Sequence, residues 1–140
     1  MARRGAPEIP VAVGDTLAGK YLVERILGAG GMGVVVAAKH LQLGERVALK
    51  FLLPDALKHP EVTARFEQEG QTAARVRSEH VARIHDVGTL ANGAPFIVME
   101  YLEGKDLAAL LDERGPIPLE EATLYLLQIC EALAEAHSLG

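Results

Sequence analysis

Several short stretches of the chain are rich in β-branched and apolar residues, and some alternate strictly between apolar and polar positions. A period of two is typical of β-strands with one buried face. The segment Leu90-Ala91-Asn92-Gly93 has the composition of a hairpin turn. The pattern predicts five antiparallel strands, at residues 19–27, 34–38, 46–52, 81–87 and 95–101.

A helical period follows a proline-marked linker and predicts a helix over residues 61–76. Five of its residues share one face: Val62, Phe66, Glu69, Ala73 and Val76. A buried Glu69 would need a cation, for which Lys50 is the obvious candidate, whereas a Glu69 at the edge of the stripe would reach water. The spacing leaves both open. Gly70 lowers helix propensity by up to about 1 kcal/mol, so we expect a loose helix.

Two further helices are predicted near the end of the sequence. A short one follows Asp106 and ends at Gly115-Pro116, and a longer one runs from about Leu119 to Ser138. The longer helix is apolar on nearly every side, with few polar residues beyond Gln128, Glu131 and Glu135. A helix with so few polar residues is normally buried on most sides, so we predict aggregation or self-association through it.

Four glycines within residues 28–33 indicate backbone that takes positive φ or lies close to another group, as in a phosphate cradle. A Gly-x-Gly-x-x-Gly loop also opens dinucleotide-binding domains, but there a helix follows the glycines. Here Val34-Val35-Val36-Ala37-Ala38 is β-branched and has no helix cap. The glycine loop is therefore predicted to join two strands.

The strand at residues 46–52 places Val47, Leu49 and Phe51 on one face, and Ala48 and Lys50 on the other. A solvent-facing Lys50 would make this an ordinary half-buried strand. If Lys50 faces the glycine loop instead, Ala48 leaves room for a flat ligand and the ammonium reaches its phosphates.

Together these residues carry a resemblance. Gly28-x-Gly30-x-x-Gly33-x-Val35 followed by Val47-Ala48-Leu49-Lys50 resembles the glycine-rich loop and strand lysine of the protein kinases. Gly31-Met32-Gly33 is similar to the form common in bacterial Ser/Thr kinases. The resemblance covers about residues 21–140. It implies an α+β fold, a kinase small lobe with a five-stranded antiparallel sheet and one helix, followed by two helices of an incomplete large lobe.

The resemblance also implies a binding site for ATP with Mg²⁺. Glu69 would pair with Lys50, Met99 would be the gatekeeper, and residues 100–102 the hinge that binds adenine through its backbone. Asp106 matches a ribose-binding position, although it is equally suited to cap the helix after it. The implied site residues are Leu27, Gly28, Ala29, Gly30, Gly31, Met32, Gly33, Val35, Ala48, Lys50, Glu69, Met99, Glu100, Tyr101, Leu102 and Asp106.

Kinase catalysis needs a His-Arg-Asp loop and an Asp-Phe-Gly metal site, and neither occurs in these 140 residues. His85 and His137 lack the neighbouring pattern, so no catalytic residue and no metal ligand is assigned. We therefore expect the N-terminal part of a Ser/Thr kinase, truncated before the catalytic loop and inactive alone. The alternative is a non-catalytic nucleotide-binding or regulatory module.

The composition limits the classes of binding partner that we expect. With 49% apolar residues, the 140-residue chain can build a core, and a net charge of -5 argues against binding nucleic acid or an anionic membrane. Cys130 is the only cysteine, and no apolar stretch is long enough to span a membrane, so we expect a cytoplasmic chain. We expect a flexible lead-in at 1–14, a small lobe at 15–101 and the hinge with the start of a large lobe at 102–140. A completed kinase would bind a protein substrate.

Overall fold

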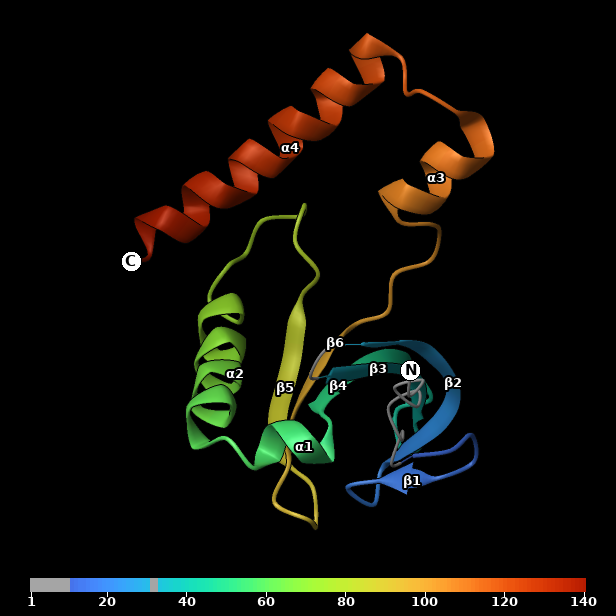
Figure 1. Ribbon diagram of the computed structural model, residues 1–140, viewed down its shortest axis with the longest axis vertical. Coiled ribbons are helices and arrows are strands. Elements are labelled where there is room, and N and C mark those ends of the chain that lie inside the picture. The colour runs from blue at the N-terminus through green and yellow to red at the C-terminus, as the bar shows by residue number, and fades with distance from the viewer. Residues whose placement is uncertain (1–10, 31–32) are drawn as a thin grey trace, which may run out of the picture.

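The computed structural model describes residues 11–30 and 33–140. Six strands form one sheet in the order β1-β2-β3-β4-β6-β5, in which every neighbouring pair is antiparallel (Figure 1). The strands are β1 (Thr16–Leu17), β2 (Tyr21–Gly30), β3 (Gly33–His40), β4 (Arg46–Leu52), β5 (Ile84–Thr89) and β6 (Pro95–Glu100). The helices are α1 (Pro54–Leu57), α2 (Pro60–Ala73), α3 (Leu107–Arg114) and α4 (Leu119–Ser138).

This arrangement confirms the predicted α+β fold and corrects its details. All five expected strands are present, and a two-residue strand, β1, extends the sheet by a sixth. The region expected to be a linker holds the one-turn helix α1, which begins at Pro54, where a missing N–H costs nothing. Residues 11–14, expected to be part of a flexible lead-in, instead contact the sheet: Val11 packs on the core, and the Gly14 N–H donates to the Val23 carbonyl at 2.9 Å.

The sheet curls around a hydrophobic core on its inner face. The ring of Tyr21 on β2 meets the ring of Phe96 on β6 edge to face, with centroids 6.2 Å apart, although two strands separate them in the sheet. Val47, Leu49 and Phe51 all enter this core, as the alternation along β4 predicts. The opposite face of β4 is therefore left for Ala48 and Lys50.

Helix α2 packs on that opposite face through a smaller cluster that includes Phe66 and Ile97. Gly70 is buried here, and a Cβ at this position would lie 2.8 Å from Cδ1 of Ile97. The glycine therefore permits a close approach of α2 to β6. The buried residues of α2 are Phe66 and Gly70, and Val62, Ala73 and Val76 of the expected stripe are half-buried. Glu69 is exposed, so the stripe is wrong at that one position.

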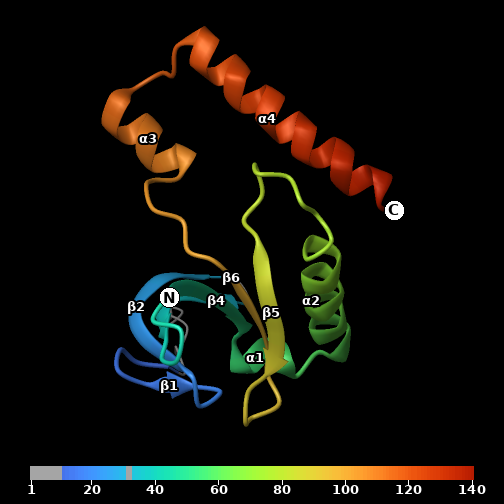
Figure 2. The ribbon, with the colours of Figure 1, turned by 180° about the vertical axis from the view of Figure 1, so that it is seen from behind.

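Helices α3 and α4 lie beyond the sheet, and Figure 2 shows α4 crossing the end of α2. Two contacts join α4 to the segment after α2. The Arg77 N–H donates to Glu135 Oε1 at 2.7 Å, and His80 Nε2 lies 3.2 Å from Glu131 Oε2. Ala132 is the buried residue of α4, and most of its leucines face solvent. None of the described helices is long and apolar enough to cross a membrane.

The connection between α3 and α4 is held by a charge-assisted cluster. Arg114 donates to both carboxylate oxygens of Glu121 at 2.8 Å, and the Tyr125 hydroxyl donates to Oε1 of the same group at 2.6 Å. These bonds, chiefly that from Arg114, lower the pKa of Glu121 from 4.5 to about 2.

We predict that this connection responds to acid. Because the pKa of Glu121 is lowered in the folded chain, the cluster stabilises the fold above pH 4.5, and that stabilisation is lost as the pH falls toward 2. Replacing Arg114 by Gln should return the pKa of Glu121 most of the way to 4.5, measured by carbon NMR titration of the carboxyl. A pKa that stays near 2 in Arg114→Gln would show that Arg114 is not the cause.

Candidate nucleotide-binding site

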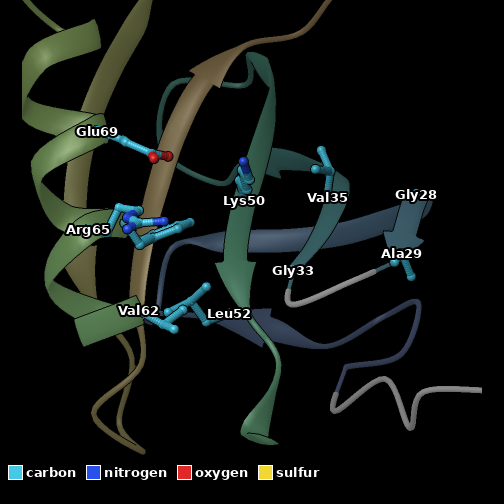
Figure 3. Close-up of a pocket in the computed structure, with 11 residues that line it drawn as sticks. Gly28, Ala29, Gly33, Val35, Lys50, Leu52, Val62, Arg65 and Glu69 are labelled. Carbon is cyan, nitrogen blue, oxygen red and sulfur yellow. The ribbon is translucent and has the colours of Figure 1, made fainter. Parts of the chain in front are cut away.

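A pocket of about 480 Å³ opens between the glycine strands, β4 and α2 (Figure 3). Its lining joins both sides of the cleft: Gly28, Ala29, Gly30, Gly33, Val35, Lys50, Leu52, Val62, Arg65, Phe66 and Glu69. Six of these belong to the site predicted from the sequence on the strand side, and Glu69 is a seventh from α2. The fold thus brings the glycine loop, the strand lysine and the helix acid around one space.

The glycines leave the wall of this pocket bare. A Cβ added to Gly28 or Gly30 would meet no atom within 4 Å, so the space beside them is open to a ligand. At Gly33 a Cβ would lie 3.8 Å from Cε of Lys50, which puts the lysine side chain directly beside the loop. Gly30 pairs with Gly33, and strand β3 follows, as predicted. Gly31 and Met32 lie outside the described residues.

Lys50 stands on the cleft face of β4. It pairs with Val35 of β3 on one side and Ile97 of β6 on the other, so its neighbours in the sheet are apolar. Its ammonium lies 5.9 Å from the centroid of the Phe66 ring, and the side chain is half-buried. Lys50 therefore faces the pocket, which favours the functional reading of the β4 pattern over a solvent-facing lysine.

The expected ion pair between Lys50 and Glu69 is not formed. Among residues 11–30 and 33–140, no contact within 4 Å joins a cation to Glu69. Glu69 is exposed, because Gly70 occupies the buried position of that turn, although Figure 3 shows its carboxylate directed from α2 toward β4. Both groups line the same pocket.

Arg65 is a pocket residue that the sequence reasoning missed. It lies one turn before Glu69 on α2, and its side chain points into the pocket (Figure 3). The spacing of four between Arg65 and Glu69 would have placed them on one helix face, which was the available signal. The pocket thus has two cations and one carboxylate, a charge balance that suits a polyanion.

The other predicted residues lie toward the hinge, outside this pocket. Ala48 is buried and pairs with Met99, whereas Leu27 and Leu102 are exposed. In the described chain, the backbone N–H groups of Tyr101 and Leu102 donate to no other group, so they are free for a ligand.

Asp106 caps a helix. Its Oδ1 accepts a hydrogen bond from the Ala109 N–H at 2.7 Å, at the start of α3. The capping interpretation of this residue is therefore the one that the geometry displays, while its second carboxylate oxygen stays available. Glu100, the first hinge residue, uses its own N–H to bond the Arg83 carbonyl at 2.8 Å.

Comparison with known proteins identifies this arrangement. The family model of the protein kinase domain matches residues 21–140. The chain belongs to the protein kinase family. Serine/threonine-protein kinase pkn3 of Myxococcus xanthus is 37% identical over 134 residues, covering 96% of this chain and 24% of that protein. Serine/threonine-protein kinase PknF of Mycobacterium tuberculosis is 38% identical over 131 residues, covering 92% of this chain and 27% of that protein.

Solved kinase structures share the fold. The crystal structure of the Mycobacterium tuberculosis PknI kinase domain matches with a TM-score of 0.80 and 34% identity, covering 93% of this chain and 52% of that chain. This kinase chain thus spans about a quarter of the length of the two relatives and about half of the solved domain. The expected membership among bacterial Ser/Thr kinase domains is confirmed.

Proposed function

We propose that this chain is the ATP-binding part of a Ser/Thr protein kinase. One observation carries the proposal: the bare glycine strands and the Lys50 ammonium border the same pocket. A triphosphate placed there would lie against backbone with no side chain in the way. A cation at about 4 Å from a phosphate oxygen contributes roughly 4 kcal/mol of attraction at the dielectric of a protein surface, before desolvation is subtracted.

The hinge would bind the adenine. The free N–H groups of Tyr101 and Leu102, with their neighbouring carbonyls, offer a fixed pattern of donors and acceptors to a flat base. Met99 and Ala48, paired across β4 and β6, would form the wall behind it. Val35 lines the pocket, and Leu27 and Leu102 are exposed, so we propose that these three cover the ring faces when the nucleotide enters.

Magnesium would be brought by the nucleotide. Within the described ranges, no three His, Cys, Asp or Glu side chains come together as a metal site. We therefore assign no metal ligand to these residues, and we propose that their role is to hold the nucleotide. Kinases transfer phosphate only when a metal and a catalytic carboxylate act together, so we propose that these 140 residues alone do not phosphorylate proteins.

Calorimetric titration of the 140-residue chain tests nucleotide binding. We expect ATP to bind more tightly than adenosine, which lacks the phosphates, and than inorganic tripolyphosphate, which lacks the base. Equal affinity for ATP and tripolyphosphate would show that the hinge does not bind adenine. Absence of any ATP binding at millimolar concentration would refute the proposed function. A parallel assay with a generic basic protein substrate should show no phosphate transfer.

The exposed face of α4 supports a proposal about association. Leu119, Leu126 and Leu127 are 82%, 61% and 63% exposed, and an apolar surface of this kind is normally covered. We propose that the isolated chain self-associates through it. Replacing Leu126 and Leu127 by Glu should shift the chain toward monomer in sedimentation velocity, whereas Leu43→Glu, at a leucine between β3 and β4 that is 68% exposed, should not.

For the whole kinase to which these residues belong, we propose protein Ser/Thr hydroxyls as the substrate class. ATP use and the lone cysteine support a cytoplasmic location for this segment.

A further inference from the structure

A β-bulge in β2 changes the direction of its side chains. The register with β3 shifts between Val23 and Arg25, so Glu24 is the extra residue. By strict alternation, Arg25 would join Tyr21 and Val23, which are buried in the core. A bulge re-aims the side chains that follow it. Arg25 is accordingly exposed, and Ile26 packs against the core instead.

The re-aimed side chains converge on the hinge tyrosine. Arg25 Nη2 donates to the Tyr101 hydroxyl at 2.7 Å. The guanidinium of Arg46, the first residue of β4, lies 5.4 Å from the centroid of the Tyr101 ring. Arg46 Nη2 in turn bonds Glu24 Oε2 at 3.0 Å, and this bond is the main cause of a raised pKa of Arg46. We call these four residues the tyrosine clamp.

Arg25 on β2 and Arg46 on β4 hold the hinge through their contacts with Tyr101. Tyr101 is half-buried, and the segment after it runs to Asp106 with no regular structure before α3 begins. Its backbone N–H has no partner in the described chain, so the contacts that hold this residue against β2 and β4 come from its side chain. Bonds to the ring edge and the ring face together restrict both χ1 and χ2, and thereby the peptide groups on either side.

We propose that Glu24, Arg25 and Arg46 are positioning residues for nucleotide binding, which act through Tyr101 to hold the hinge peptides ready for adenine. This inference rests on the proposed ATP site. Preorganised donors and acceptors bind more tightly because less conformational freedom is lost when the ligand arrives. Arg25 and Arg46 contact the tyrosine, and Glu24 holds Arg46. All three lie outside the lining of the phosphate pocket.

A comparison of two ligands separates positioning from charge. Arg25→Met with Arg46→Met removes both grips and two positive charges. We expect ATP affinity to fall about five- to tenfold, because a hinge that is no longer held must be ordered when the ligand arrives. Affinity for inorganic tripolyphosphate, which does not use the hinge, should stay within about twofold. Equal losses for both ligands would show a general electrostatic effect and overturn the proposal.

Conservative variants sharpen the test. Tyr101→Phe keeps the ring under Arg46 and loses the hydroxyl, so it should weaken ATP binding as much as Arg25→Met alone. Arg46→Lys should retain part of the stacking and lie between wild type and Arg46→Met. Arg75→Met, at an exposed arginine just after α2, is the matched control and should bind both ligands as wild type does.

Hinge mobility tests the clamp without any nucleotide. Backbone NMR order parameters at residues 101–103 should be near 0.85 in the wild type, as in the strands, and fall below about 0.6 in the double Met variant. Unchanged order parameters would overturn the clamp even if ATP binds well. A chain that binds no ATP but loses hinge order in the variant would refute the proposed function and leave the clamp standing as a structural device.

Discussion

Phe51→Ala should lower the free energy of unfolding by about 3–5 kcal/mol. The side chain is 1% exposed and lies in the core that the sheet curls around, so its removal leaves a cavity that the surrounding strands cannot fill. That loss is a large fraction of the 5–15 kcal/mol typical of a folded domain. Urea unfolding followed by circular dichroism measures it, as a shift of the midpoint at constant slope.

A smaller substitution checks the cause. Phe51→Leu keeps most of the apolar volume and should lose less than half as much, because the residual cavity is smaller. A loss below about 1 kcal/mol for Phe51→Ala would mean that β4 is not the centre of the core. Because the chain has an exposed α4, these measurements belong at a protein concentration where sedimentation shows a monomer.

The two faces of β4 could be predicted from the sequence because the information is local. Strict alternation assigns Phe51 to one face and Lys50 to the other, whatever the rest of the chain does. The glycine spacing and the β-branched run after Gly33 are local in the same way, and the structure places a strand there. The α+β class followed from these features together with the family resemblance.

The burial of Gly70 in place of Glu69 on α2 was beyond a periodicity argument. Apolar spacing selected a stripe through Glu69, but the buried position is Gly70, where the absence of a side chain lets Ile97 approach. A glycine carries no hydrophobic signal, so its role is visible only once the strand that meets it is known. The Lys50–Glu69 pair, which was expected and is not formed, was predicted wrongly for the same reason, because it assumed that Glu69 occupies the buried position.

The contacts of the Tyr101 side chain could not be predicted from the sequence either. Its partners come from β2 and β4, and Arg25 reaches the tyrosine only because the bulge at Glu24 reverses the alternation. Nothing in the local sequence marks that bulge. By contrast, the exposure of the α4 leucines could be predicted from the sequence. A helix with almost no polar face exposes apolar residues whichever side it packs through.

Lys50→Ala should weaken ATP binding by about 10- to 100-fold, because a hydrogen bond to a charged group contributes about 1.5–3 kcal/mol and the pocket side of β4 offers no replacement. Tripolyphosphate binding should fall by a similar factor, since the ammonium serves the phosphates and not the base. This pattern is the opposite of that expected for the tyrosine clamp. Calorimetry with both ligands therefore distinguishes the two ends of the site.

Stability should change little in the same variant. In the described chain Lys50 has no ion-pair partner, and its contact with the Phe66 ring is long, so the free energy of unfolding without nucleotide should shift by no more than about 0.5 kcal/mol. Lys39→Ala removes an exposed lysine of β3 and is the matched control, for which ATP affinity should stay unchanged. If Lys39→Ala and Lys50→Ala weaken ATP binding equally, the effect is one of net charge, and Lys50 has no special place in the pocket. If only Lys50→Ala weakens ATP binding, two adjacent residues of β4 have separate roles: Phe51 stabilises the fold, and Lys50 binds the phosphates.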